Sequence, residues 1–381
     1  MTRTDDHMKA RQMPESTSGS TAQSGATKTG ASGASGGTLA HGTLSPTIRR
    51  AIGLGAIAAG FALSFLLGWG FNQVGIVVLA ALIYCVTIYA ASRATEGSRH
   101  ALDRLVTGVV TTMFALALIP LVSVLIEVVR KGAERFDVEF FTLTMRGIVG
   151  EGGGAYHAIQ GTLIVTAIAS VVAIPIGILA AIYLVEYGQK NRLARALTFF
   201  VDVMTGIPSI VAGLFAYALW VLFMGPGARA GIIGATALAV LMIPTVVRST
   251  EEMLRIVPND LREAAYALGV PKWLTIVKVV LPTALAGIAT GVTLAIARVI
   301  GETAPLLVTV GITTSYNANP FSGRMATLPV FSYYQYATPG IPPEPFLDRA
   351  WAAALVLMLI VMGLNIIARV ISKLFAPKAG R

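Results

Sequence analysis

Residues 159–185 read IQGTLIVTAIASVVAIPIGILAAIYLV, a stretch of 27 residues without Asp, Glu, Lys or Arg. A helix needs roughly 20 residues to cross the hydrocarbon core of a bilayer, which is ~30 Å thick. An uncharged stretch longer than that predicts a transmembrane helix. We therefore expect a membrane protein.

Apolar stretches of this kind recur along the chain. Of the 381 residues, 55% are hydrophobic and only 13% are charged, whereas about a quarter of the residues of a soluble domain are charged. The eight stretches are 51–69, 74–91, 105–129, 159–185, 199–223, 230–247, 284–312 and 351–374. They predict an all-α fold, a polytopic transmembrane helix bundle. The seventh stretch is long and contains Gly301 and Pro305, which predicts a tilt or a kink there.

The composition argues against several other classes of protein. The single cysteine, Cys85, cannot form an intramolecular disulfide, and the four histidines lack the spacing of metal ligands, so no metal site is expected. The formal net charge is +10, but the basic residues flank apolar stretches and act as topology signals. We therefore expect contact with the lipid bilayer and no binding of nucleic acid.

The first 46 residues are expected to form a disordered cytoplasmic tail. Residues 16–38 include 6 Ser, 6 Gly and 5 Thr, and such a composition buries too little apolar area to offset the cost of ordering. The tail does not resemble a signal peptide. Its basic start has no apolar stretch close behind it, and the stretch from Ala51 continues too far for a cleaved segment.

The distribution of Lys and Arg predicts the orientation. With a cytoplasmic amino terminus, the cytoplasmic segments hold 21 of the 29 Lys and Arg and the opposite segments hold 7, which is the usual bias. The cytoplasmic segments are 1–50, 92–104, 186–198, 248–283 and 369–381. We expect a multi-pass protein of the cell (plasma) membrane with both termini cytoplasmic. Loops 130–158 and 313–350 are then external, and the second is either a packed lid or an ordinary connector.

The cytoplasmic segment between the sixth and seventh stretches has a distinct pattern. Residues 262–273 read REAAYALGVPKW, in which strong helix formers precede Gly269 and Pro271. Gly269 suits the left-handed end of one helix and Pro271 suits the start of the next, so two short helices joined at a bend are predicted. An apolar face follows at helical spacing, at Trp273, Ile276, Val277 and Val280. This face is expected to bury against the membrane surface or a partner.

The same segment resembles the EAA loop of ABC importer permeases. The resemblance rests on the spacing of Glu263-Ala264-Ala265, Gly269, Ile276 and Leu281-Pro282. It implies that the segment docks into a groove on a cytoplasmic ATPase, with Glu263, Ala264, Gly269 and Ile276 as the coupling residues. From the residues alone, an amphipathic connector is the alternative.

Three further patches resemble the phosphate-specific transport permeases, most closely their A-type subunit, with the similar C-type subunit as the alternative. The patches are Gly161-Thr162-Leu163 with 175–187, then 206–215 (GIPSIVAGLF), and 301–307 (GETAPLL). The resemblance covers residues 105–375 and implies a six-span ABC importer permease core with a coupling loop at 251–283. Residues 47–104 are then an additional transmembrane hairpin that adds two N-terminal spans, and residues 376–381 are a cytoplasmic C-terminus.

The seventh stretch contains Arg298 and Glu302. Placed i and i+4 on a helix, the two side chains share one face. Ionisable groups at membrane depth are costly unless paired or hydrated, and they mark a pathway by default. A guanidinium matches a phosphate bidentately, while a carboxylate accepts a hydrogen bond from the proton of hydrogen phosphate and repels the fully ionised sulfate. We expect Arg298, Glu302 and Thr303 to line a substrate path, and a structural ion pair between helices is the alternative.

Other polar residues in the spans carry weaker expectations. Thr162, Thr166 and Ser209 either line the same route or pack within the bundle. Asp202 is expected to bridge two helices, and Glu186 to lie at the cytoplasmic interface.

The chain lacks the marks of an enzyme. No stretch matches Gly-x-x-x-x-Gly-Lys-[Ser/Thr], and no nucleophile and base set is visible, so no catalytic residues are expected. We expect no cofactor on this chain, with ATP and Mg²⁺ bound by a partner ATPase. The resemblance implies a second homologous permease subunit, two copies of the cytoplasmic ATPase and an extracytoplasmic phosphate-binding protein.

The function expected from the sequence is that of a transmembrane permease subunit of an ATP-driven importer of inorganic phosphate. Two alternatives stay open. A permease for molybdate or sulfate would keep the coupling loop, whereas an ion-coupled secondary transporter would usually show repeated halves and no such loop.

Overall fold

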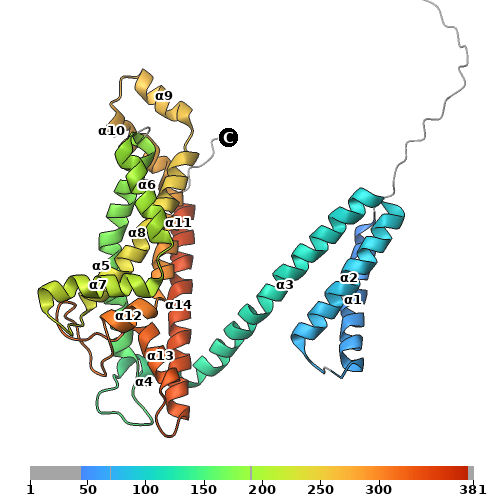
Figure 1. Ribbon diagram of the computed structural model, residues 1–381, viewed down its shortest axis with the longest axis horizontal. Helices are drawn as coiled ribbons and strands as arrows, with labels where there is room; N and C mark the ends of the chain where they lie inside the picture. Colours follow the sequence, from blue (N-terminus) through green and yellow to red (C-terminus); the bar gives the residue numbers. More distant parts are fainter. Residues whose placement is uncertain (1–43, 69, 189–190, 376–381) are drawn as a thin grey trace, which may run out of the picture. The chain divides into compact units, whose positions relative to one another are not determined.

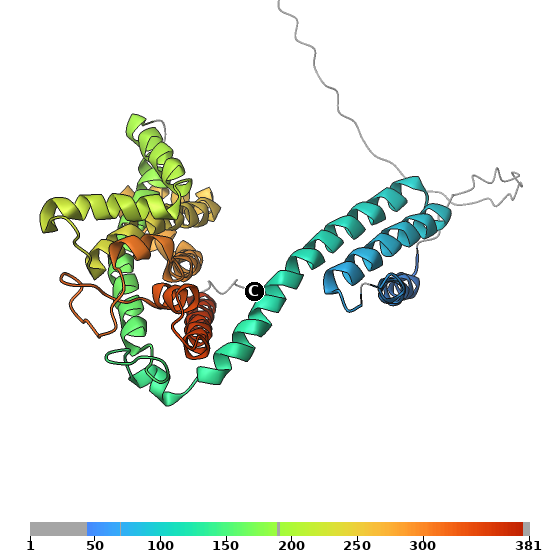
Figure 2. The ribbon, with the colours of Figure 1, turned by 60° about the horizontal axis from the view of Figure 1, so that its bottom comes forward.

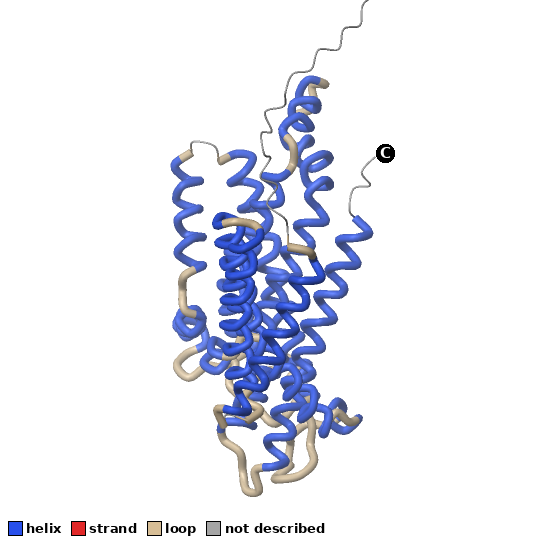
Figure 3. Tube along the Cα trace, turned by 90° about the vertical axis from the view of Figure 1, so that its right-hand side faces the viewer, coloured by secondary structure: helices blue, strands red, loops and turns tan. Residues whose placement is uncertain are grey.

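The computed structural model describes residues 44–68, 70–188 and 191–375, and every regular element in these ranges is a helix (Figure 3). This confirms the all-α fold. The predicted tail up to residue 43 and the predicted C-terminus 376–381 lie outside the described residues. The chain divides into two compact units, 1–113 and 114–381, and the boundary falls inside one helix.

The first unit contains α1 (Pro46–Leu66), α2 (Gln73–Thr95) and the start of α3 (Ser98–Gly132). Side-chain oxygens cap the first two helices: Ser45 Oγ accepts from the Ile48 N–H at 3.3 Å, and Asn72 Oδ1 from the Gly75 N–H at 3.1 Å. α1 and α2 pack closely at Gly60, where a β-carbon would lie 2.6 Å from the backbone nitrogen of Ala80. The two helices thus form a packed hairpin.

Glu96, between α2 and α3, connects the ends of this unit. Its carboxylate accepts from the Leu44 N–H at 2.7 Å and the Ser92 hydroxyl at 2.6 Å, and it lies 3.5 Å from Arg104 Nε. The hydrogen bonds from Ser92 and Leu44 lower the pKa of Glu96 from an ordinary value of 4.5 to about 2. Glu96 is therefore ionised at neutral pH.

Because the folded pKa lies below the ordinary one, Glu96 contributes stability that is complete above pH 4.5 and is lost as the pH falls toward 2. Glu96→Gln is expected to lower the unfolding temperature of the solubilised protein at pH 7. The difference from the unchanged protein should shrink at pH 3. Glu127→Gln, which removes two ion pairs within α3, those with Arg130 and Lys131, is the control. A Glu96→Gln difference that is the same at both pH values would contradict the assignment.

The second unit contains the remaining helices. They are η1 (Ala133–Arg135), α4 (Val138–Thr142), α5 (Tyr156–Ile182), η2 (Tyr183–Tyr187), α6 (Arg192–Thr205), α7 (Ser209–Met224), α8 (Gly231–Ile256), α9 (Asn259–Ala267), α10 (Lys272–Thr275), η3 (Ile276–Val280), α11 (Leu281–Ile300), α12 (Ala304–Thr309), α13 (Leu328–Ala337) and α14 (Glu344–Phe375). The segments η2 and η3 are π-helical. In Figure 1, α5, α8, α11 and α14 run alongside one another, with α9 and α10 at one end and α4 and α13 at the other.

Small residues allow α5 and α8 to pack closely. A β-carbon on Gly177 of α5 would lie 2.6 Å from the side chain of Val246 on α8. Val299 of α11 and Leu306 of α12 are buried in the core that α5 and α8 share. This packing fixes the end of α11 and the start of α12 beside the middle of α8.

Seven described helices are long and apolar enough to span a membrane, and α6 with α7 forms an eighth segment that is bent by 111°. The predicted span 199–223 is therefore divided between two helices that meet at a sharp corner. Figure 2 shows the corner between α6 and α7. Pro208 explains it, because proline has no N–H to continue the helix and disfavours helical geometry in the residue before it.

The seventh predicted stretch also differs from the structure. α11 ends at Ile300, and Pro305 occupies the second position of a new helix, α12. The predicted kink or tilt in this stretch is a full interruption in the structure, located between Gly301 and Pro305. α12 packs against α7 so closely that a β-carbon on Gly213 would lie 2.7 Å from Pro305 Cα.

Candidate functional site

A cavity of about 210 Å³ lies where the corner between α6 and α7 meets α8 and the end of α11. It is lined by Met204, Thr205, Ile207, Ser209, Leu241, Pro244, Thr245, Arg298 and Glu302. The structure thus brings Arg298 and Glu302 to one cavity, where three hydroxyl side chains join them. Arg298 is exposed and Glu302 is half-buried.

The two charged residues are arranged differently from the prediction. Glu302 lies beyond the last residue of α11, so it does not share a helix face with Arg298. None of the ion pairs within 4.0 Å among the described residues joins the two side chains. Gly301 ends the helix between them and turns Glu302 into the cavity as part of the connection to α12. The predicted structural ion pair therefore finds no support here.

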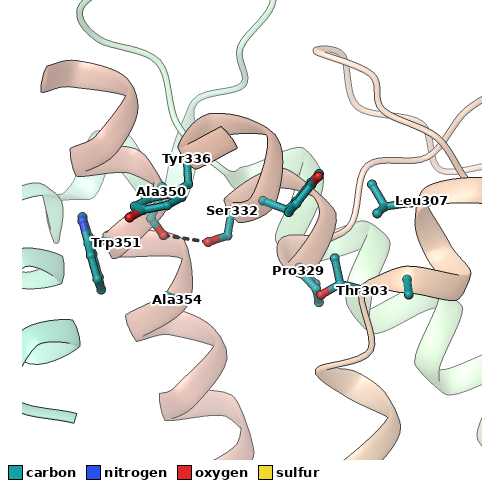
Figure 4. Close-up of a pocket in the computed structure, with 10 residues that line it drawn as sticks. Thr303, Leu307, Pro329, Ser332, Tyr336, Ala350, Trp351 and Ala354 are labelled. Carbon is teal, nitrogen blue, oxygen red and sulfur yellow. Dashed lines mark hydrogen bonds between the residues drawn. The ribbon is translucent and has the colours of Figure 1, made fainter. Parts of the chain in front are cut away.

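Thr303 lies elsewhere. It lines a different cavity of about 510 Å³ between α12, α13 and α14. Figure 4 shows Thr303 and Leu307 on one side of this cavity and Tyr336 and Trp351 on the other, while the Ser332 hydroxyl donates to Ala350 O at 2.9 Å. Thr303 is therefore not brought together with Arg298 and Glu302.

The other predicted hydroxyls divide in the same way. Ser209 lines the Arg298 cavity. Thr162 is buried, donates to Ala158 O at 2.8 Å and accepts from the Leu328 N–H at 2.7 Å, so it packs α5 against the start of α13. In the described ranges, no three His, Cys, Asp or Glu side chains are grouped as metal ligands.

The coupling loop has the predicted form. α9 ends at Ala267, Gly269 follows with φ of +75°, and α10 begins after Pro271. The bend closes through the Gly269 N–H, which donates to Tyr266 O at 2.9 Å, and the Val270 N–H, which donates to Ala265 O at 3.1 Å. Two short helices joined at a glycine bend are thus confirmed.

The predicted coupling residues divide between the surface and the core. Glu263, Ala264 and Gly269 are exposed, but Ile276 is only 4% exposed and packs inside the chain. Ile276 therefore cannot contact a partner in this conformation. The expected apolar face divides likewise, since Val280 is buried while Trp273 and Val277 remain exposed. Leu268, Trp273 and Val277 are thus three exposed apolar side chains of this loop.

Ion pairs near the coupling loop were largely missed by the sequence analysis. Arg262 pairs with Glu186 at 2.9 Å, and both side chains are nearly buried. Arg248 of α8 pairs with Asp202 of α6, which confirms the expected bridge between helices, and with Glu251 at 2.7 Å. Partners such as Glu186 and Arg262, 76 residues apart, leave no local sequence signal.

Residues 173–381 match the family of binding-protein-dependent transport system inner membrane components. The match covers the corner between α6 and α7, the Arg298 cavity and the whole coupling loop. The fold and this match define the class of protein: a membrane component of a transport system that works with a binding protein.

Relatives identify the branch of that class. The phosphate transport system permease protein PstA 1 of Mycobacterium tuberculosis (strain CDC 1551 / Oshkosh) is 49% identical over 265 residues, which cover 68% of this chain and 85% of the relative. PstA of Yersinia pestis is 40% identical over 294 residues, covering 77% of this chain and 96% of the relative. The chain therefore belongs to the family of PstA phosphate transport permeases.

Among solved structures, a chain of the MetNI methionine ABC transporter in an inward-facing conformation matches with a TM-score of 0.48 and 18% identity. The match covers 63% of this chain and all of that one.

Proposed function

We propose that this chain is the membrane-spanning subunit of an ATP-driven importer of inorganic phosphate and that the anion passes the cavity of Arg298 and Glu302. The observation that carries the proposal is that one arginine, one carboxylate and three hydroxyls line a single cavity of this chain, which is similar to PstA phosphate permeases. A guanidinium offers planar, bidentate donors to a tetrahedral oxyanion, and hydroxyls complete its shell.

The ends of two helices shape the electrostatics of this cavity. Ser209, the first residue of α7, lines it, and the N–H groups at a helix start favour an anion. Arg298 lies in the last turn of α11, where the helix end favours a cation. In the proposal, the phosphate replaces water around Arg298, while the Glu302 carboxylate accepts a hydrogen bond from the P–O–H group of hydrogen phosphate, which keeps its proton.

ATP hydrolysis is assigned to a separate chain. The exposed part of the coupling loop is proposed to dock on a cytoplasmic ATPase. This part comprises Glu263, Ala264 and Gly269 and the exposed apolar side chains of Leu268, Trp273 and Val277. The proposed assembly contains two copies of that ATPase, a second homologous permease that covers the exposed Arg298, and an extracytoplasmic phosphate-binding protein. Movement of the coupling loops would then alternate the access of the cavity between the two sides.

Reconstituted vesicles test the function. The assembled complex, supplied with its binding protein, is expected to take up radioactive phosphate only when ATP is present on the ATPase side. An excess of sulfate or molybdate should compete weakly. Uptake driven by an ion gradient without ATP would contradict the proposal, and preferential uptake of molybdate or sulfate would reassign the substrate.

The orientation has its own test. In a Cys85→Ser background, Arg255→Cys places a thiol in the first part of the coupling loop and Ala318→Cys places one in the 313–350 loop; both positions are exposed. With both termini cytoplasmic, a membrane-impermeant maleimide added to intact cells should label position 318 and spare position 255 until the cells are opened. The reverse pattern would overturn the orientation.

A further inference from the structure

Arg262 on α9 uses every donor of its guanidinium. Nε and Nη2 donate to Glu186 Oε1 at 3.1 and 2.9 Å, and Nη2 also donates to Leu254 O at 3.0 Å. Nη1 donates to Val257 O at 2.7 Å and Asn259 Oδ1 at 3.2 Å. The Arg262 side chain is 12% exposed and that of Glu186 is 5% exposed. A planar fork held by five bonds fixes the orientation of α9 as well as its distance from its neighbours.

These contacts join three elements of the bundle. Glu186 belongs to η2, the π-helical continuation of α5, whereas Leu254 lies in the last turn of α8 and Val257 directly follows that helix. Lys272 of α10 makes a second attachment at the same place, because its Nζ donates to Glu186 O and lies 4.9 Å from the ring centre of Tyr187. Both short helices of the coupling loop are thus held on η2.

The joined elements lead to the Arg298 cavity. Leu254 and Val257 are buried in one core with Ala181 of α5. Further along α8, Leu241, Pro244 and Thr245 line the cavity itself. A displacement of α9 that keeps the Arg262 contacts intact must therefore move the ends of α5 and α8 with it.

We propose that Arg262 is a positioning residue of transport: through Glu186 and the end of α8 it makes the coupling loop, α5 and α8 move as one body, and the pair stays closed through the cycle. This inference rests on the proposed function. Loss of one partner of a buried pair leaves an uncompensated charge, so the joint should fail when either residue is neutralised.

The test compares phosphate taken up with ATP hydrolysed by the complete complex in vesicles. Arg262→Gln should lower the phosphate transported per ATP at least tenfold, while the ATPase copurifies within twofold of the normal yield. Arg262→Lys, which keeps the charge without the fork, should recover only part of that loss. The double change Arg262→Gln with Glu186→Gln should be no worse than the larger single effect, because both remove the same pair.

Arg255→Gln is the matched control. Arg255 lines the same cavity of about 690 Å³ beside Arg262, but its side chain is 68% exposed, and it pairs with Glu251 one helical turn away. Because the Arg255 side chain is itself exposed and the buried Glu251 keeps Arg248 as a partner at 2.7 Å, the ratio should stay within twofold of normal. An equal loss in Arg255→Gln would overturn the proposal by assigning the effect to the charge of the cavity.

A normal ratio in assembled Arg262→Gln complexes would also overturn it. If Arg262→Gln does not assemble, Glu186→Gln, which keeps the size of the side chain, is tested by the same ratio of phosphate transported to ATP hydrolysed. Failure of both variants to assemble would assign the pair to assembly and reject the coupling role. Absence of ATP-dependent phosphate uptake by the unchanged complex would instead reject the proposed function itself.

Discussion

Arg298→Gln is expected to lower ATP-dependent phosphate uptake by about 10- to 100-fold per assembled complex. Hydrogen bonds to a charged partner contribute about 1.5–3 kcal/mol, and each 1.4 kcal/mol corresponds to about a factor of ten. Arg298 is the one arginine that lines the cavity of Thr205, Ser209 and Thr245. Arg298→Lys keeps the charge but loses the planar fork, so its uptake should lie between that of the unchanged protein and that of Arg298→Gln.

The controls use neighbouring residues. Thr303→Ala, which alters the cavity beside Trp351, should leave uptake close to normal. Because Arg298 and Glu302 form no ion pair in the described structure, the double change to glutamine should not restore uptake. Full rescue of both abundance and uptake would instead identify a structural pair. Glu302→Gln alone should weaken discrimination against sulfate, as measured by competition.

Gly269→Val is expected to reduce the amount of ATPase that copurifies with the permease about 5- to 30-fold. Gly269 has φ of +75°, and a side chain in this conformation costs roughly 1–2 kcal/mol, with β-branched residues at the upper end. The structure describes no atom within 4 Å of a β-carbon built here, so the cost comes from the backbone alone. Phosphate uptake should fall in parallel while the permease still inserts.

Gly269→Asn tests whether the left-handed bend itself, rather than the absence of a side chain at residue 269, is needed for docking. Asparagine tolerates the left-handed conformation, so this variant should retain most of the ATPase. Normal copurification and normal uptake in Gly269→Val would show that the bend does not position the docking surface.

The sequence predicted the helices well and their ends poorly, and the prolines show why. Pro120, Pro175 and Pro244 lie inside continuous helices, whereas Pro208 and Pro305 stand at the starts of new ones. A proline inside a helix removes one hydrogen bond, whereas a proline at a helix start removes none, and neighbouring helices decide whether the carbonyl freed by an interior proline is tolerated. Those neighbours are distant in sequence, so hydropathy alone joined α6 to α7 and α11 to α12.

The candidate site could be predicted where charged residues stand within a stretch expected to cross the membrane, because such residues are rare there. Arg298 and Glu302 stood out because charges are costly within apolar stretches. The periodicity around Ile276 predicted an apolar face, but only the fold shows that Ile276 and Val280 turn inward while Trp273 and Val277 do not. The pairing of Arg262 with Glu186 depends on how α9 folds back on η2, which no local pattern records.

The length of α3 determines where Glu96 resides. At 1.5 Å per residue, its 35 residues extend about 52 Å, well beyond the ~30 Å of hydrocarbon. Its uncharged part, 105–126, nearly matches that thickness, so the first two turns, with Arg99 and Arg104, stand in the headgroup layer or beyond. Glu96, which is buried among Leu44, Ser92 and Arg104, therefore lies at headgroup level on one side of the bilayer, so only acidification of that side would reach it.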